Sequence, residues 1–197
     1  MLNRSLPYFL EDRTGIVSRT TFDDIYDRLF LSIDPSSSSS TVTISSSPRR
    51  ASSHTDSTQP RRLSSYAKEA DSPSTAVTLH FGQRGTLGSV VFPDESVVPM
   101  ASWLKKTGLF SGSLSRKFTA SDGEEYRWVY QSATEHEWTL IHTQSNLTVA
   151  HYIPKPPHKT AYGTSGNVLT IYEVCGGVAV EILASLTVMR YIAANGL

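Results

Sequence analysis

The stretch VAVEILASLTVMRYIAA, residues 178–194, decides how the rest of the chain is organised. It predicts an α-helix with apolar side chains on nearly every side, namely Val178, Val180, Ile182, Leu183, Leu186, Val188, Met189 and Ile192. A helix on the surface of a soluble protein shows one apolar stripe and a polar face. We therefore expect other elements of the chain to enclose this helix.

A membrane span is the alternative interpretation of residues 178–194, and the two charges in the stretch argue against it. At about 1.5 Å per residue the helix reaches about 26 Å, somewhat less than the roughly 30 Å of hydrocarbon in a bilayer. Glu181 and Arg190 would each cost about 2.5–3.5 kcal/mol near the centre of a span. In a core helix, the helix dipole favours Glu181 near the start and Arg190 near the end. We favour a core helix and expect no transmembrane span.

Composition limits the class of protein. The 197 residues suit one domain of ordinary size, and the 18 basic and 18 acidic residues give no overall field that would attract nucleic acid. The single cysteine, Cys175, excludes an intramolecular disulfide, and the N-terminus has no apolar segment typical of a secretory signal. We expect a cytoplasmic protein that does not bind nucleic acid.

The first 75 residues divide into two regions. Residues 1–34 predict two or three N-terminal strands from apolar runs at 8–10, 15–17 and 29–33, with a helical turn at 24–29 as an alternative. Residues 35–75 are rich in serine, and they predict a disordered insertion because little burial offsets about 1–2 kcal/mol of backbone entropy per residue. Val42 and Ile44 alternate with threonines and could extend an edge strand before the disorder begins.

Residues 76–197 predict the main part of the folded domain. A short helix is expected near 97–106, with lysines in its last turn and Gly108 as its stop. Asp122-Gly123 predicts a tight hairpin turn. The expected strands lie at 76–81, within 82–92, and at 115–120, 125–132, 137–143, 147–153 and 167–174.

The fold class follows from this order of elements. Strands do not alternate with long helices, so a parallel α/β sheet is not expected. On the strand at 125–132, Tyr126, Trp128 and Tyr130 share one face, as Trp138 and Leu140 do on the next strand. We expect a mainly β protein, an antiparallel sheet or β-barrel wrapped around the hydrophobic C-terminal helix, with one additional short helix.

The chain contains, in this order, the blocks FTASDGEEYRWVYQS, EWTLIHT, LTVAHYI, VLTIYEV and EILASLTVMRYI. Together these blocks resemble a fungal family of uncharacterised domains known as DUF6593. It covers residues 76–197 well and residues 6–34 loosely. The family is similar to the tubby C-terminal and scramblase-like group, so the resemblance implies a closed β-barrel around a C-terminal helix and weakly suggests lipid or partner binding. It implies no role for any particular residue.

The serine-rich insertion contains two candidate phosphorylation sites. Arg49-Arg50-Ala51-Ser52 and Arg61-Arg62-Leu63-Ser64 both fit the substrates of basophilic kinases, so Ser52 and Ser64 are the candidate residues. A phosphate would place nearly two negative charges beside the arginines and could fold the segment back on itself. Such short motifs also arise by chance.

Catalytic and metal-binding chemistry finds little support in the sequence. Cys175 with His136, His142 or His151 would be needed for nucleophilic catalysis, but their spacing matches no known arrangement. A small buried thiol is the simpler explanation of Cys175. We expect no enzyme activity, no catalytic residues, no cofactor and no metal site.

Local basic residues are the remaining candidates for binding. Lys105, Lys106, Arg116 and Lys117 could hold an anion or a lipid head group, although surface lysines usually only interact with water. We expect a non-enzymatic binding or scaffold domain for an unidentified protein partner, regulated by phosphorylation of its serine-rich loop. A peripheral phospholipid- or phosphoinositide-binding module of the tubby-like type is the alternative. The sequence does not indicate an oligomeric state.

Overall fold

The structure is a computed structural model that describes residues 6–36, 40–47, 76–83, 86–108, 113–131, 137–155 and 165–197. Its helices are α1 (Met100–Trp103), the 3-10 helix η3 (Glu173–Val178) and α2 (Ala179–Asn195). The strands are β1 (Tyr8–Asp12), β2 (Thr20–Asp24), β3 (Phe30–Pro35), β4 (Thr41–Ser47), β5 (Ala76–His80), β6 (Ser89–Val91), β7 (Val97–Pro99), β8 (Lys105–Lys106), β9 (Arg116–Thr119), β10 (Glu125–Gln131), β11 (Glu137–His142), β12 (Thr148–Ile153) and β13 (Asn167–Ile171).

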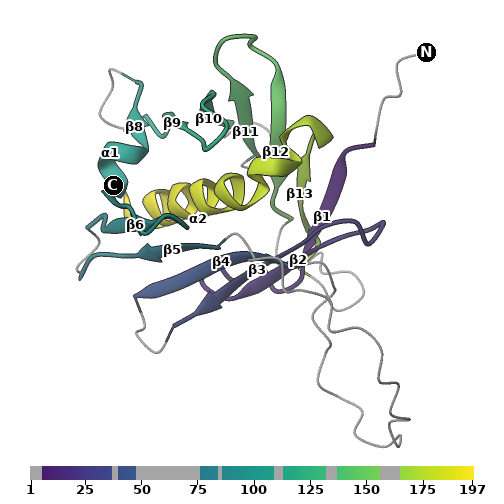
Figure 1. The fold of residues 1–197 in the computed structure, drawn as a ribbon, viewed down its shortest axis with the longest axis horizontal. Helices are drawn as coiled ribbons and strands as arrows, with labels where there is room; N and C mark the ends of the chain where they lie inside the picture. Colours follow the sequence, from purple (N-terminus) through teal and green to yellow (C-terminus); the bar gives the residue numbers. More distant parts are fainter. Residues whose placement is uncertain are drawn as a thin grey trace, which may run out of the picture.

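These strands form one antiparallel sheet that curls around α2 (Figure 1). The strand order is β7-β6-β5-β4-β3-β2-β1-β13-β12-β11-β10-β9-β8, so β1 near the N-terminus pairs with β13 near the C-terminus. A mainly β fold around a C-terminal helix, with a second short helix, is confirmed.

The sheet is not closed, and this corrects the closed barrel that the family resemblance implies. Its end strands β7 and β8 do not pair in the described sheet, and α1 connects them. β7 has three residues and β8 has two, so the chain turns away before these strands could form a ladder. We call the resulting opening, bounded by β6 and β7 on one side and by β8 and β9 on the other, the open seam.

Two of the three apolar runs in residues 1–34 form strands, as the sequence predicts. The runs at 8–10 and 29–33 form β1 and β3, which confirms both strands. The run at 15–17 is not a strand, because Gly15 has a φ of +73° and lies in the connection between β1 and β2. No helical turn forms at 24–29 either: β2 continues to Asp24, and a tight turn with Asp27 at a φ of +56° leads into β3.

Part of the segment that was predicted to be disordered forms a strand. Residues 41–47 form β4, so the prediction of disorder from residue 35 is wrong for this segment. Val42 and Ile44 are buried and lie in a strand as expected, but β4 pairs with both β3 and β5 and is not an edge strand. Pairing on both sides supplies the order that the local composition lacks. Residues 48–75 lie outside the described residues.

The short helix predicted near 97–106 exists but spans only residues 100–103. Leu104 leaves the helical conformation, with its N–H donating to Met100 O at 2.8 Å. The following lysines pair with β9 as the strand β8, so they do not form the last turn of a helix, and Gly108 is not its stop. Burial of Met100 and Trp103 anchors this turn of helix to the core.

The strands that follow α1 agree with the sequence. β9, β10, β11 and β12 lie where they were predicted, and Gly123 has a φ of +83° in the turn between β9 and β10. The predicted strand at 167–174 ends earlier, at Ile171, where η3 takes over. Gly176 is required in η3 because a Cβ there would lie 2.9 Å from the Tyr8 ring.

α2 is the centre of the core, as the sequence predicts. Its residues from Ala179 to Met189 are all buried, and the strands supply the surrounding wall. Trp128, fully buried on β10, donates from its indole Nε1 to Ser185 Oγ on α2 at 2.9 Å. The predicted wall residues Tyr126, Trp128, Trp138 and Tyr152 are all buried.

Arg190 is held by specific contacts near the end of α2. Its Nη2 donates to Gly15 O at 2.9 Å, its Nη1 lies 3.7 Å from Asp12 Oδ2, and its guanidinium lies over the Tyr152 ring. Asp12 is fully buried and also accepts hydrogen bonds from Thr20, Tyr152 and Asn167. This network connects the helix to β1, β12 and β13. The charge of Arg190 is therefore stabilised by these contacts as well as by the helix dipole.

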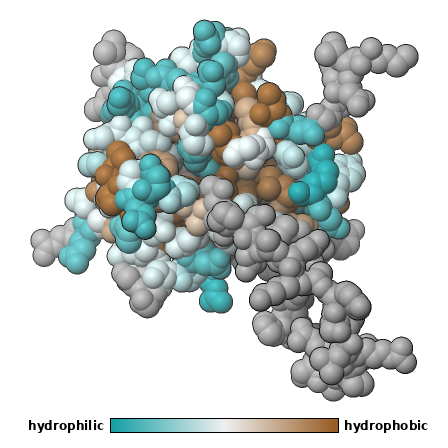
Figure 2. Space-filling model, in the orientation of Figure 1, coloured by the Kyte–Doolittle hydropathy of each residue, from teal (hydrophilic) through white to brown (hydrophobic). Residues whose placement is uncertain are grey.

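The segment Glu173–Asn195 is long and apolar enough to cross a membrane, but in this fold most of it is enclosed by the sheet. Large apolar side chains remain on the surface at other positions, with Val174 the most exposed at 90%. On the face shown in Figure 2, apolar groups are interspersed with hydrophilic ones. Isolated surface apolar residues are common in soluble proteins.

Candidate functional site

The open seam contains two neighbouring pockets, which make it the candidate binding site. The larger pocket has a volume of about 420 Å³ and the smaller one about 220 Å³. Thr119, at the end of β9, lines both pockets. Pockets that bind small ligands usually measure about 300–1,000 Å³, so the larger one is of adequate size.

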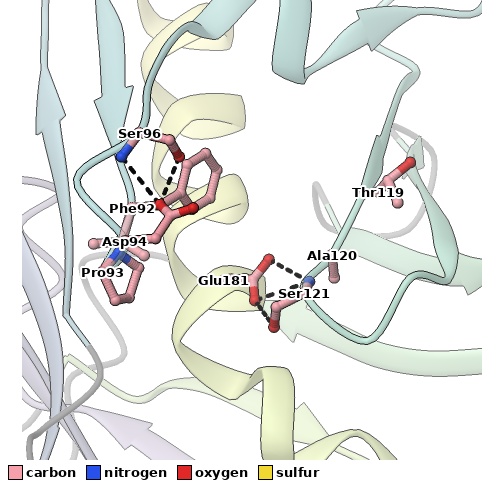
Figure 3. A pocket seen from close by; sticks show the side chains of 9 residues that line it. Phe92, Pro93, Asp94, Ser96, Thr119, Ala120, Ser121 and Glu181 are labelled. Carbon is pink, nitrogen blue, oxygen red and sulfur yellow. Dashed lines mark hydrogen bonds between the residues drawn. The ribbon is translucent and has the colours of Figure 1, made fainter.

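The larger pocket lies between two turns and reaches α2 (Figure 3). The turn after β6 supplies one wall and the end of β9 with the following turn supplies the other, while Glu181 comes from the first turn of α2. The lining residues are Val77, Phe92, Pro93, Asp94, Ser96, Thr119, Ala120, Ser121 and Glu181. Most of the exposed surface of the walls is apolar, and the pocket carries two carboxyl groups.

Glu181 is a buried acid in this pocket, with 6% of its surface exposed. The Ser121 N–H donates to both of its carboxylate oxygens, at 3.1 and 3.0 Å, and the Ser121 hydroxyl also donates to Oε1. Burial raises the pKa of Glu181, the hydrogen bonds from Ser121 oppose that rise, and the charge of Asp122 adds to it. The helix start therefore holds a carboxyl group in a desolvated site.

Asp94 is the second acid of the larger pocket and lies in the turn after β6. It is exposed, and it accepts hydrogen bonds from Ser96 N at 3.0 Å and Ser96 Oγ at 2.6 Å. These bonds lower the pKa of Asp94, so this carboxylate stays ionised at neutral pH.

The smaller pocket lies beside a row of basic residues. Lys105 on β8 is directly opposite Lys117 on β9, and Lys117 is directly opposite Arg127 on β10. Lys105 and Lys117 both line the pocket, and Lys117 Nζ lies 2.9 Å from Glu125 Oε2. Like charges directly opposite one another destabilise a sheet. A bound anion would reduce the repulsion within this basic row.

Among the residues that the structure describes, two hydrogen-bond donors in this area, Trp103 Nε1 and Arg127 Nε, have no partner. Trp103 also lines the smaller pocket and is 7% exposed, and its Nε1 is buried without a hydrogen bond. Arg127 Nε is likewise buried and unpaired. Buried donors are nearly always satisfied in native proteins, so the unpaired indole N–H of Trp103 in this pocket is consistent with a ligand that accepts hydrogen bonds.

The four basic residues selected from the sequence divide between the two faces of the sheet. Lys105 and Lys117 come together at the smaller pocket, whereas Lys106 is opposite Arg116. Arg116 is buried, its Nη1 donates to Ser113 O and Ser115 O, and burial lowers its pKa. Arg116 therefore does not contribute to a surface anion site.

The residues considered for nucleophilic catalysis are not arranged for it. Cys175 is buried in η3, and its pKa is raised, first of all by burial. An activated thiol needs a lowered pKa. His142 is bound to Glu124 and Ser145, and His151 packs near Tyr172.

Other predicted site residues cannot be placed in the same way. His136, Ser52 and Ser64 lie outside the described residues. Within the described ranges, no group of three or more histidine, cysteine, aspartate or glutamate residues could hold a metal ion.

The comparison with protein families finds a match to a domain family. Residues 29–191 match a family of unknown function, DUF6593. The chain belongs to this family. The match includes β3 to β13 and most of α2, so the strands that bound the open seam are part of the family domain. Comparisons with curated proteins and with solved structures found no match.

Sequence reasoning missed the larger pocket of this DUF6593 domain. Glu181 was explained by the helix dipole alone, and nothing in the sequence places it beside Ser121, sixty positions earlier. Trp103 lies within the predicted short helix and Arg127 within the predicted strand at 125–132, and neither pattern indicates a binding role. The one available signal was the acidic charge of a residue inside an otherwise apolar helix.

Proposed function

We propose that this DUF6593 domain is a non-enzymatic binding module for a protein partner and that its ligand site is the open seam. The supporting observation is the pocket of about 420 Å³ that reaches from the surface to a buried carboxylate on the central helix. A few polar groups in a mostly apolar concave site are typical of binding sites. The buried, high-pKa thiol of Cys175 favours binding over nucleophilic catalysis.

An NMR fragment screen tests this proposal on the full chain. Fragments of positive, negative and no net charge would be added to labelled protein, and amide shifts would be followed at Ser96 and Ser121. We expect shifts at these two positions and none at Leu31 on β3, which lines neither pocket. If no fragment of any charge shifts Ser96 or Ser121, the open seam is not a binding site.

Peripheral phospholipid or phosphoinositide binding is a second candidate function, favoured by the smaller pocket. Lys105, Lys117 and Arg127 form a basic row, and the unpaired Trp103 Nε1 could donate to a phosphate oxygen. Membership of a fungal group related to tubby and scramblase-like proteins would agree with this function. The charges lie at the surface, so such binding would weaken as salt increases.

Vesicle co-sedimentation tests the second candidate. Phosphatidylcholine vesicles with and without a phosphoinositide would be mixed with wild type and with Lys105→Gln/Lys117→Gln, using Lys155→Gln as a control outside the smaller pocket. We expect phosphoinositide-dependent binding that the double variant loses and the control keeps. Equal binding by wild type and the double variant would refute a role for this row.

We also propose that the domain acts in the cytoplasm and that phosphorylation of Ser52 or Ser64 regulates it. A pair of arginines lies three and two positions before each serine, which suits basophilic kinases. Mass spectrometry of the protein isolated from its own cells tests this. Unmodified Ser52 and Ser64 under all growth conditions would contradict the regulatory part of the proposal.

A further inference from the structure

The larger pocket contains a buried carboxyl group, that of Glu181, which has no cationic partner among the described residues. In the part of the chain that the structure describes, Ser121 donates every hydrogen bond that the Glu181 carboxylate accepts, and no lysine, arginine or histidine forms an ion pair with Glu181. A buried carboxylate without a cationic partner is costly. A cation bound in the pocket would remove that cost.

A second carboxylate belongs to the same pocket from a different element. Asp94 lies in the turn after β6, and among the described residues Ser96 is its hydrogen-bond donor. Figure 3 shows Asp94 and Glu181 on opposite sides of the space between the two turns. Two carboxylates in one cavity favour a ligand with two positive groups.

The two turns that flank the pocket carry the same sign of charge. The turn at 92–96 contains Asp94 and Glu95, and the turn at 120–124 contains Asp122 and Glu124, with no lysine or arginine in either. Their field would attract a cation and repel a phosphate. The larger pocket therefore differs in charge from the basic row beside the smaller pocket.

The apolar part of the pocket wall favours a cation that is carried on an apolar stem. Val77, Phe92 and Pro93 line the pocket, and the Phe92 ring packs edge-on against Trp103 at a centroid distance of 5.5 Å. An arginine side chain can lay its methylene groups on such a wall and place its guanidinium near an aromatic face. Its planar donors also bind carboxylates in pairs.

We propose that the larger pocket of the open seam binds the paired arginine side chains of a peptide, one near Glu181 and one near Asp94. This inference rests on the proposed binding function and identifies the ligand class of that site. The chain itself carries such pairs at Arg49-Arg50 and Arg61-Arg62, and another protein could supply the same chemistry.

Fluorescence anisotropy with a labelled peptide tests the proposal on the full chain. The probe is STQPRRLSSYAK, residues 57–68, and its control carries citrulline in place of both arginines. Citrulline keeps the shape of arginine and removes the charge. We expect the citrulline peptide to bind at least tenfold more weakly, since charge-assisted hydrogen bonds are lost.

Variants of the two carboxylates locate the binding. Glu181→Gln and Asp94→Asn are each expected to lower the affinity of the domain for the arginine peptide by about tenfold. Glu137→Gln on β11 lies outside both pockets, so we expect it to leave this affinity unchanged. Asp94 is exposed, so Asp94→Asn remains informative if Glu181→Gln fails to fold.

A further variant identifies the source of the arginines. Arg49, Arg50, Arg61 and Arg62 would be changed together to glutamine in the full chain. If these residues occupy the pocket of their own chain, the variant binds the probe more tightly than wild type, because tethered groups compete at high effective concentration. Equal affinity of the variant and wild type assigns the pocket to arginines of another chain, and either result agrees with the proposal.

Three outcomes would overturn the inference, and only the last of them also refutes the proposed function. If arginine and citrulline peptides bind equally and both shift the amides of Ser96 and Ser121, the open seam binds peptides but not through charge. If the arginine peptide shifts neither amide while uncharged fragments do, the ligand class is wrong and the binding site stands. Failure of every probe at both amides would refute the binding function as well.

Discussion

Replacing Ser185 by alanine tests how α2 is joined to the sheet. Ser185 and Trp128 are both fully buried, and the indole Nε1 donates to Ser185 Oγ at 2.9 Å. Ser185→Ala removes the acceptor and leaves the indole N–H unpaired where water cannot reach it. Such a loss costs about 1–3 kcal/mol, which corresponds to roughly 2–12 °C in melting temperature for a chain of this size.

Thr187→Val provides a matched control on the same helix. The Thr187 hydroxyl is also buried, but it donates to Leu183 O at 2.8 Å within α2 and not to the sheet. Valine keeps the shape of threonine, and the Leu183 carbonyl can keep its helical hydrogen bond. We expect Thr187→Val to lower the free energy of unfolding less than Ser185→Ala does.

Urea unfolding followed by tryptophan fluorescence and by circular dichroism gives both free energies. In the background Trp128→Phe, which has no indole N–H, Ser185→Ala is expected to cost about 1 kcal/mol less than in wild type. If Ser185→Ala costs no more than Thr187→Val, or if the cost is unchanged in the Trp128→Phe background, the hydrogen bond between helix and sheet is not a source of stability.

Three further predictions concern the core and the larger pocket. Leu186→Asp buries an unpaired charge in α2, so we expect no soluble protein with a cooperative thermal transition, and a variant that melts cooperatively would show that the helix is not in the core. Because the pKa of Glu181 is raised in the folded protein, its contribution to stability falls as pH rises from the unfolded value of about 4.3 through the folded value. Glu181→Gln is therefore expected to gain melting temperature relative to wild type between pH 4 and pH 7, and a constant difference in a pH series would contradict this. Cys175 is buried with a raised pKa, so we expect an aromatic disulfide reagent to modify it only in denaturant, and rapid modification of the native protein would count against that burial.

The elements that were predicted correctly have strong local patterns. The helix at 178–194 has too many apolar residues for a surface position, and β10 alternates aromatic with polar residues at the period of a strand. Predictions from such patterns agree with the structure because the pattern indicates both the type of element and its buried face.

The predictions of the fold were wrong where pairing with residues distant in the sequence overrides the local preference of a segment. Residues 41–47 have the composition of a flexible segment, yet they form β4 because β3 and β5 satisfy their backbone hydrogen bonds on both sides. Lys105 and Lys106 continue a helical pattern, yet they pair with β9. A sequence read in short windows contains no information about such partners.

The candidate site was harder to predict than the fold. Lys105 and Lys117 were selected as basic residues, but only the register of β8 and β9 brings them together and assigns Arg116 to the interior. The larger pocket depends on the meeting of Ser121 and Glu181. Neither residue has an unusual sequence neighbourhood.

The sequence of this chain was sufficient to establish a mainly β protein built around an enclosed C-terminal helix, because hydrophobic periodicity is a local property. It did not establish that the sheet remains open. That outcome depends on two short end strands, β7 and β8, which are separated by α1 and do not pair. The open seam and its pockets exist because residues distant in the sequence meet there, and tertiary packing alone determines which residues meet.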